Sequence, residues 1–483
     1  MLLAAHLRHA GVLWAEEDLP LAIALQMKHG AMIYRDAWFD KPPLVPAIYL
    51  LWGVAIGPLL RFAGAAYGLI ACVLVYGIAD GLWSQREGYL AAALLAFFLT
   101  FDTHSAVLPL AADLLLLVPH LAAIFFAVRK QPLFSGIAAG VGFLFNAKAV
   151  LVLAACALFV WPGVISLLAG FVLPNVVALA WLAGAGALPA YLDQVWRWPA
   201  QYAGSPVVSN PVMNGAIRTL NWMGFHAALV IGAAIFWLRE RQWKFVVWAA
   251  ICYAGVVLGW RFFPRYFFLL LPALTICASR GILIVGPRQG LGMKGGWYLF
   301  RARRKPGGRA EALTLQRREL SGIERWRMSV LLLLLIPLIR FGPRYISLSN
   351  WSDLALDEDS RAASQIILAQ SHPDSTLYVW GYRPEIYLYT HLKPATKYLE
   401  CQAMTGVPAD RHLVQSTVVL TQGTHEAREE LARSAPDFVV DGLSPYNPAL
   451  SVQNYPELRP WIAQYKEAGR TKGTILYMRS TMR

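Results

Sequence analysis

The chain has 483 residues, of which 57% are hydrophobic and 15% are charged, and its mean hydropathy is +0.45. Soluble domains carry about 25% charged residues, so this composition excludes a soluble cytosolic enzyme. It also excludes a nucleic-acid-binding protein, despite the formal net charge of +14. How the charge is distributed along the chain is therefore more informative than its total.

Apolar runs recur from residue 44 onward and predict a polytopic α-helical membrane protein. The uncharged runs are 44–60, 62–79, 88–101, 131–147, 149–192, 219–238 and 245–260. Less clean runs cover 107–128, 266–286 and 328–339. Run 149–192 is long enough for two crossings of about 20 residues each, with a turn at 161–163. We predict a membrane domain over residues 1–345 with about ten transmembrane helices and additional interfacial helices.

The positive charge is concentrated in residues 286–327, which hold eleven Lys or Arg residues against three Glu. An excess of Lys and Arg in a loop between apolar spans is typical of the cytoplasmic side of a membrane. With this loop inside, run 44–60 fits best along the outer interface, because it has charges at both ends and several prolines. The same topology gathers a set of charged residues on the outer side: Lys41, Arg61, Asp102, Asp113 and Arg265.

Residues 346–483 have the pattern of a soluble α/β domain, which this topology places outside. Expected helices at 357–369 and 427–435 alternate with expected strands at 376–380, 416–420, 436–440 and 474–478. This alternation predicts a small sheet with helices packed against it. The five cysteines form no pattern that suggests a disulfide framework or a zinc site.

The most informative segment lies near the start of the chain. Three acids, Glu16, Glu17 and Asp18, are followed by Gly30, by Tyr34-Arg35-Asp36 and by Lys41-Pro42-Pro43-Leu44. In an otherwise apolar region, charged residues that converge on one face are candidates for a functional site.

This segment resembles the first outer loop of the GT-C superfamily of polyprenyl-phosphate-sugar-dependent glycosyltransferases. That superfamily includes the protein O-mannosyltransferases and the lipid A aminoarabinose transferase. Three further matches are Asp113, Asn146-Ala147-Lys148 and Arg265-Tyr266. The chain departs from the family in having Glu16-Glu17 where Asp usually begins the acidic pair. Residues 1–14 are also short and polar for the first transmembrane helix of the family, so we expect a remnant of that span or a start further upstream.

The resemblance implies an inverting glycosyl transfer on the outer face of a bacterial inner membrane, with the C-terminal domain in the periplasm. Such a transfer needs a carboxylate base for the acceptor hydroxyl and cations for the leaving phosphate. The expected catalytic carboxylates are Glu16 or Glu17, with Asp18 also possible, and Asp113. The expected substrate-binding residues are Tyr34, Arg35, Asp36, Lys41, Arg61, Lys148, Arg265 and Tyr266.

The expected donor is a polyprenyl-phosphate sugar held among membrane lipids, and the acceptor is an unknown glycan, lipid or protein. No cofactor or metal is required, although a divalent metal is used by some relatives that transfer to asparagine. A transporter or flippase of a lipid-linked or small polar substrate is the alternative. Transporters, however, place their charges near mid-membrane and often contain inverted repeats, and neither feature is found here. A third possibility is a non-catalytic relative whose tail binds a partner.

Overall fold

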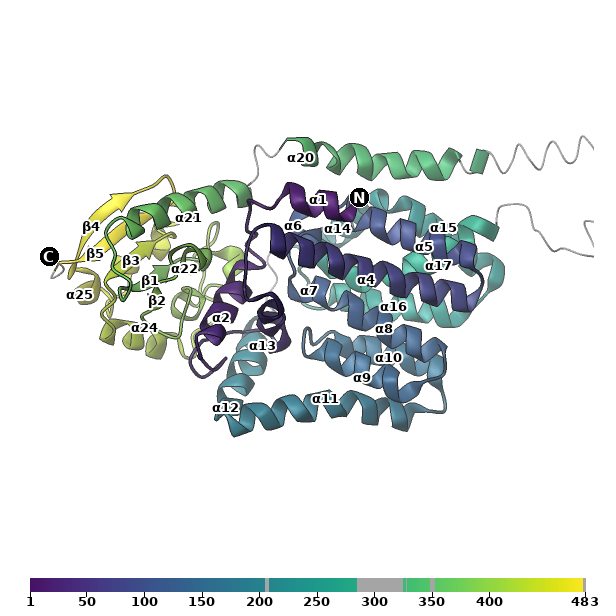
Figure 1. Cartoon of the computed structure of the whole chain (residues 1–483), viewed down its shortest axis with the longest axis horizontal. Helices are drawn as coiled ribbons and strands as arrows, with labels where there is room; N and C mark the ends of the chain where they lie inside the picture. Colours follow the sequence, from purple (N-terminus) through teal and green to yellow (C-terminus); the bar gives the residue numbers. More distant parts are fainter. Residues whose placement is uncertain (205–207, 285–324, 327, 348–351, 481–483) are drawn as a thin grey trace, which may run out of the picture.

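The computed structural model describes residues 1–204, 208–284, 325–326, 328–347 and 352–480. Nearly all of the predicted basic loop at 286–327 lies outside these residues. Two parts are visible in Figure 1, a helical bundle and a C-terminal domain that contains a sheet and lies at one end of the bundle.

The bundle contains long helices, short helical turns between them and one π-helical segment, η2. Its elements are α1 (Leu2–Arg8), α2 (Asp18–Lys28), α3 (Leu44–Ala47), η1 (Ile48–Trp52), α4 (Pro58–Leu82), α5 (Gln85–Phe98), α6 (His104–Val107), α7 (Ala112–Leu115), α8 (Leu117–Val128), α9 (Pro132–Phe143), α10 (Ala149–Val160), α11 (Val164–Gly184), α12 (Leu188–Tyr191), η2 (Leu192–Arg197), α13 (Trp198–Tyr202), α14 (Pro211–Phe225), α15 (Ala227–Glu240), α16 (Trp243–Val257), η3 (Pro264–Leu269), α17 (Leu271–Ile284) and a helix at Met328–Ile346 that ends in α20 (Pro343–Ile346).

Among the described residues, three helices are long and apolar enough to cross a membrane: α4, α11 and Met328–Ile346. A fourth span results if α14 and α15 are counted together, although they meet at an angle of 89°. The remaining apolar helices are shorter, so the expected number of about ten spans is not established by helix length. These apolar helices make the bundle the membrane-embedded part of the chain.

Three predicted features of the bundle can be compared directly with the structure. The turn at 161–163 is confirmed, because α10 ends at Val160 and α11 begins at Val164. Run 219–238 is not one straight helix. It is broken at His226, whose buried imidazole lies 3.4 Å from an oxygen of Asp102. Run 44–60 divides into α3, η1 and the first turn of α4, and none of these short turns could cross a membrane alone.

The C-terminal domain is built on a five-stranded mixed sheet of order β2-β1-β3-β5-β4. β1 pairs in parallel with β2 and β3, whereas β5 is antiparallel to β3 and β4. The strands are β1 (Thr376–Trp380), β2 (Lys393–Pro394), β3 (Phe438–Asp441), β4 (Tyr465–Arg470) and β5 (Ile475–Arg479). The helices and helical turns are α21 (Ser352–Leu368), α22 (Glu385–Thr390), α23 (Gln402–Thr405), η4 (Ala409–Arg411), α24 (Thr424–Arg433), η5 (Pro448–Leu450), η6 (Val452–Asn454) and α25 (Arg459–Ile462).

The small sheet with packed helices is confirmed, and three of the four predicted strands match β1, β3 and β5. The prediction of a strand at 416–420 is wrong. That segment forms no ladder, because the amides of Val419 and Leu420 both donate to the carbonyl of Gly406. β2 and β4 were not predicted. β2 has only two residues, and β4, with the sequence YKEAGR, is mostly polar.

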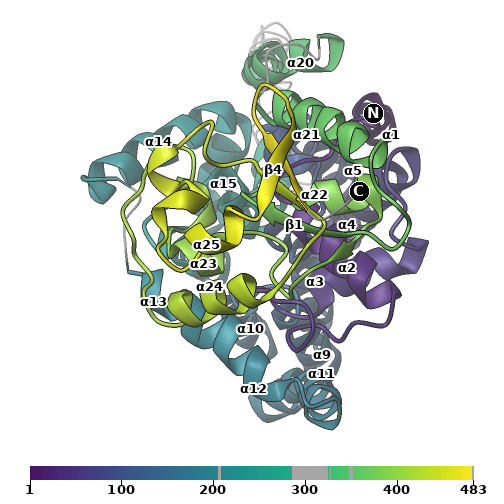
Figure 2. The same ribbon diagram turned by 90° about the vertical axis from the view of Figure 1, so that its left-hand side faces the viewer.

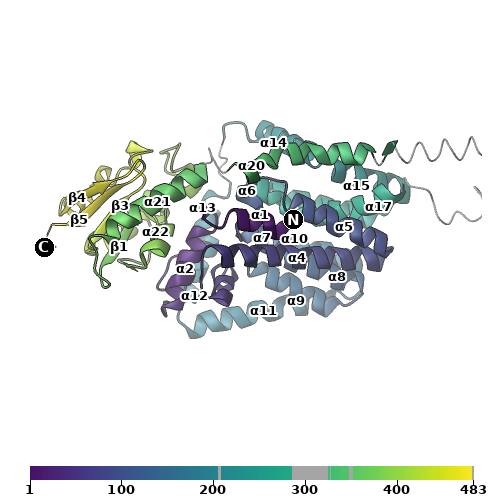
Figure 3. The same cartoon turned by 45° about the horizontal axis from the view of Figure 1, so that its top comes forward.

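The C-terminal domain is joined to the bundle through the segment between α1 and α3. Figures 2 and 3 show the domain covering one end of the bundle, with α2 lying between the two parts. The amide of Trp38 donates to the carbonyl of Lys397 at 2.8 Å, and Arg361 donates to the carbonyl of Gly11 at 2.9 Å. Arg261 forms an ion pair with Asp410 of η4 at 3.1 Å. The two parts therefore pack through specific polar contacts.

A buried ion pair between Glu17 and Arg61 fastens the start of this segment to α4. Both side chains are buried completely, and the guanidinium of Arg61 donates to both carboxylate oxygens of Glu17. It also donates to the carbonyls of Val12 and Leu108, and the amide of Trp14 donates to Glu17. Because the polar atoms of a buried pair must satisfy one another, this pair fixes how the chain turns before α2.

The close contact between α9 and α11 depends on glycine, and we predict that Gly170→Leu destabilises the protein. A Cβ atom at Gly170 would lie 2.2 Å from the carbonyl oxygen of Leu133 and 3.0 Å from the amide of Ile137. Overpacking typically costs about 1–3 kcal/mol. Thermal unfolding in detergent should show a lower midpoint for Gly170→Leu. Gly184→Leu, at the exposed end of the same helix, is the control because a Cβ there meets nothing within 4 Å. Equal midpoints for the two variants would contradict the predicted contact.

The buried ion pair leads to a second stability prediction. Arg61→Met alone leaves the Glu17 carboxylate buried without its cation, which typically costs about 3–5 kcal/mol. The double variant Glu17→Gln/Arg61→Met has no buried charge and keeps an acceptor for the amide of Trp14, so its midpoint should recover most of the loss. Thermal unfolding of the two variants measures the difference. A double variant less stable than Arg61→Met would show that the pair does not act in this way.

Candidate active site

Four segments that are distant in sequence converge at the end of the bundle facing the C-terminal domain. Glu16 lies just before α2, Asp113 lies in α7, Lys148 precedes α10 and Arg265 lies in η3. Nη1 of Arg265 is 2.5 Å from a carboxylate oxygen of Glu16, and its Nε is 3.5 Å from Asp113. Nζ of Lys148 is 3.2 Å from the other oxygen of Asp113. Two carboxylates and two cations therefore form one alternating network.

Neighbouring polar and aromatic groups hold this network in place. The side-chain amide of Asn146 donates to Asp113 at 3.0 Å, and the amide of Lys148 donates to Asn146 at 3.0 Å. Nζ of Lys148 also lies 3.3 Å from the ring centroid of Tyr266, a cation–π contact. The structure thus brings together Asp113, Lys148, Arg265 and Tyr266, four of the residues expected in the site, and their roles stay predictions.

The network lines a cavity of 450 Å³, which we call the inner cavity. Its polar lining includes Glu16, Lys41, Asp113, Lys148 and Arg265. Its apolar lining comes from the bundle and includes Val45, Phe145, Val195, Pro199 and Leu258. A charged surface and an apolar surface therefore face the same space.

A second cavity of 350 Å³, the outer cavity, adjoins the first. The two cavities share Glu16, Lys41 and Arg265 in their linings. Residues of the C-terminal domain complete the outer cavity, including Tyr382, Arg383, Glu400, Gln402 and Asp410. The candidate site therefore lies between the two parts of the chain.

Lys41 lies where the two cavities meet. Its Nζ is 2.8 Å from an oxygen of Asp40, and its side chain is 46% exposed, compared with 17% for Lys148. The hydroxyl of Tyr34 donates to the carbonyl of Lys41 at 2.8 Å, and the backbone of Tyr34 is tied to Ala37 and to Gln194. Tyr34 thus positions Lys41 through the backbone and lines neither cavity.

Several residues predicted for the site lie elsewhere. Glu17 and Arg61 are committed to their buried ion pair and line neither cavity. Arg35 and Asp36 form an exposed ion pair with each other. Asp36 also caps the turn, since its carboxylate accepts from the amide of Met32. In this structure the four residues shape the loop and do not line the two cavities.

Asp18 also lies outside both cavities. It is buried in the first turn of α2, where its carboxylate accepts from the amide of Leu19 at 2.6 Å. Burial, together with the nearby carboxylate of Glu385, raises the pKa of Asp18. Of the three consecutive acids, Glu16 is therefore the one that faces the cavities.

The sequence suggests a C-terminal accessory domain above the active face that guides the acceptor, but it singles out none of the domain's residues as part of the site. Tyr382, Glu400 and Gln402 reach the site only because the domain packs over α2, and no local pattern distinguishes them. Arg261 is different, because it lies four residues before Arg265 in a short run rich in aromatic residues and could have been noticed.

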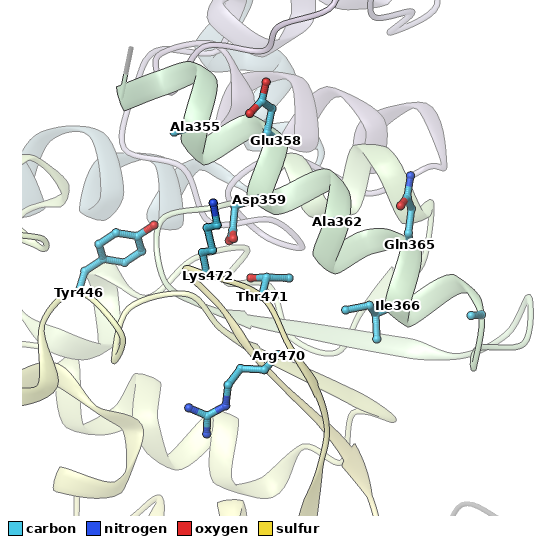
Figure 4. Close-up of a pocket in the computed structure, with 11 residues that line it drawn as sticks. Ala355, Glu358, Asp359, Ala362, Gln365, Ile366, Tyr446, Arg470, Thr471 and Lys472 are labelled. Atoms are coloured by element: carbon cyan, nitrogen blue, oxygen red, sulfur yellow. The ribbon is translucent and has the colours of Figure 1, made fainter. Parts of the chain in front are cut away.

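Two further observations concern the rest of the described chain. Within residues 1–204, 208–284, 325–326, 328–347 and 352–480, no group of three or more His, Cys, Asp or Glu side chains could hold a metal ion. A separate groove of 790 Å³ runs between α21 and the β4–β5 turn (Figure 4). It is lined by residues such as Asp359, Tyr446 and Lys472, and by none of the predicted site residues.

No family model matches the chain, and no curated protein matches it. Solved structures do show similarity. ArnT from Cupriavidus metallidurans in the apo state aligns with a TM-score of 0.57 and 14% identity, covering 98% of this chain and 95% of that one. An oligosaccharyltransferase from Archaeoglobus fulgidus, tethered with an acceptor peptide, aligns with a TM-score of 0.50 and 12% identity, covering 99% and 73%. Both are GT-C glycosyltransferases, so the resemblance inferred from the outer-loop motif is confirmed at the level of the fold.

Proposed function

We propose that this chain is an integral-membrane glycosyltransferase that moves a sugar from a polyprenyl-phosphate carrier to an acceptor hydroxyl. The observation that carries the proposal is the inner cavity, where three carboxylates, four cations and an apolar wall face one space. The GT-C fold supports it, since the two similar structures named above are both glycosyltransferases.

Glu16 is the proposed general base. Its side chain is 36% exposed and lines both cavities, whereas Asp113 is 13% exposed and is held by Lys148, Asn146 and Arg265. A base must reach the acceptor proton, and a carboxylate with an accessible oxygen can do so. Asp113 then has a positioning role, because it fixes the two cations around it.

The cations are proposed to bind the phosphate of the carrier. Lys41 is the most accessible of them, and Lys148 and Arg265 lie deeper in the same cavity. When an anionic phosphate binds Arg265, it competes with Glu16 for the guanidinium and so frees the carboxylate to act as a base. Substrate binding and activation of the base are therefore coupled through one arginine.

The proposed reaction is a single displacement with inversion. Glu16 takes the proton of the acceptor hydroxyl, and the oxygen attacks the anomeric carbon. The bond from that carbon to the phosphate oxygen breaks at the same time, and polyprenyl phosphate leaves with the bonding electron pair. Lys41, Lys148 and Arg265 stabilise the charge that develops on the leaving phosphate. The apolar lining of the inner cavity suits the first isoprenoid units of the carrier.

The site is proposed to face the outer side of the membrane. The site end of the bundle contains Arg61 at the start of α4, whereas Trp83, which follows the end of this helix, contacts Arg280 at the opposite end. The sequence places the Lys- and Arg-rich residues 286–327, which directly follow α17, in the cytoplasm. The C-terminal domain and the cavities then lie outside.

Replacing the base should abolish transfer. With a panel of glucosyl-, mannosyl- and arabinosyl-phosphoryl polyprenols and an envelope extract as acceptor, the purified protein should release polyprenyl phosphate from one donor. Glu16→Gln should lower the rate by about 10²–10⁴-fold. Glu467→Gln, an exposed carboxylate on β4, is the control. Undiminished release by Glu16→Gln would overturn the assignment of the base, and movement of intact donor across vesicles would favour a flippase.

The orientation can be tested by labelling single cysteines in intact cells. All five native cysteines are buried. Val414→Cys, at a position 78% exposed on the C-terminal domain, should react with a membrane-impermeant maleimide. Gln131→Cys, in the turn between α8 and α9, should react only after the cells are permeabilised. Labelling of both positions from the same side would contradict the proposed topology.

A further inference from the structure

The linings of the two cavities differ in charge. The residues that line only the inner cavity include one ion pair, Lys148 with Asp113. Those that line only the outer cavity include the acids Asp353, Glu400 and Asp410 and one cation, Arg383. Arg383 is already paired with Asp359 at 2.7 Å. The outer cavity is therefore the less favourable of the two for an anion.

The cations that reach the outer cavity are all engaged by acids. Lys41 pairs with Asp40, Arg265 with Glu16 and Arg261 with Asp410. Burial lowers the pKa of His412, which also lines this cavity, to about 4, so its imidazole is neutral at pH 7. A phosphate or carboxylate that entered the outer cavity would have to displace one of these acids.

Glu400 forms no ion pair within the part of the chain that the structure describes, although the charge of Lys41 acts on it. It is 2% exposed, and one of its oxygens accepts from the backbone amide of Gln402 at 2.5 Å. Its carboxyl group makes no other hydrogen bond within the described part of the chain. Burial is the main cause that raises the pKa of Glu400 to about 8, so the group is mostly protonated at pH 7 and can both donate and accept.

The side chain of Gln402 adds a donor beside this carboxyl group. Its oxygen accepts from the amide of Ala409 at 3.0 Å, and its NH₂ group has no partner among the residues that the structure describes. Trp38 and Tyr382 add aromatic surface to the same cavity. A neutral sugar has hydroxyl groups that donate and accept, and it has apolar ring faces that pack on aromatic side chains.

The stereochemistry of the proposed reaction indicates which cavity holds the donor and which holds the acceptor. Inversion requires the acceptor oxygen to approach the sugar from the side opposite the leaving group. With the phosphate beside Lys148, which lines only the inner cavity, and with Glu16 lining both cavities, the acceptor comes from the outer cavity. We propose that the outer cavity is the acceptor subsite, and that Glu400 and Gln402 bind a hydroxyl group of a neutral saccharide there. This inference rests on the proposed function.

The test measures binding of two matched probes to the full-length protein in a zwitterionic detergent, since maltoside detergents carry a competing sugar. Methyl β-D-glucopyranoside should bind at least about tenfold more tightly than methyl β-D-glucuronide at pH 7. Glu400→Leu should weaken binding of the neutral probe about tenfold, because both hydrogen-bonding functions are lost. Glu400→Gln should stay within about threefold of the wild type, because the amide also donates and accepts.

Glu426→Leu, an exposed position on α24 that lines neither cavity, is the control. If Glu400→Leu does not fold, Gln402→Met replaces it and should show the same weakening. No saturable binding of the neutral probe, equal binding of the glucuronide or unchanged binding by the leucine variant would each overturn the proposal. Glu16→Gln separates this failure from failure of the proposed function, because it should lose turnover and still bind the neutral probe.

Discussion

The ion pair between Glu17 and Arg61 is the constraint from which the arrangement of the site follows. Glu17 is drawn into the bundle, where a buried guanidinium and a backbone amide satisfy its carboxylate. Glu16, its neighbour in the chain, leaves the same turn toward Arg265 and the cavities. Two consecutive residues of the same type thus have different functions. Glu17 loses its hydration and anchors the loop, whereas Glu16 keeps an accessible oxygen.

Arg265 is the central residue of the charged network that lines the inner cavity. It lies between Glu16 and Asp113, so the charges of the network alternate and no carboxylate faces another without a cation nearby. In the proposed reaction, the incoming phosphate replaces one of these carboxylates as the partner of the arginine. The apolar surroundings strengthen the ion pairs of the network, so the choice of partner for Arg265 decides whether Glu16 is paired or free to accept a proton.

The sequence predicted the membrane bundle, the C-terminal sheet domain and the convergence of Lys41, Asp113, Lys148 and Arg265. The structure contains the bundle and the sheet and brings these four residues together. They could be predicted because charged residues in apolar surroundings are few and a short motif marks the loop. The sequence could not separate Glu16 from Glu17, since spacing alone does not say which of two adjacent side chains turns inward. It also assigned Arg61 to the substrate, because the buried partner of Arg61 lies 44 residues away. The strand expected at 416–420 failed for a similar reason, because Gly406 supplies the acceptor that a neighbouring strand would have supplied.

The contribution of the C-terminal domain is the part that no local pattern could reveal. Glu400 and Gln402 lie more than 350 residues from Glu16 in the chain, and they meet it only through the packing of one domain on the other. The cation-rich inner cavity belongs mainly to the bundle, whereas the acids that are unique to the outer cavity come from the C-terminal domain. Under the proposed function, the bundle would recognise the carrier, while residues of the C-terminal domain would take part in selecting the acceptor. Under the proposed function, changing the acceptor would involve the C-terminal residues of the outer cavity, because the proposed base and phosphate-binding cations belong to the bundle.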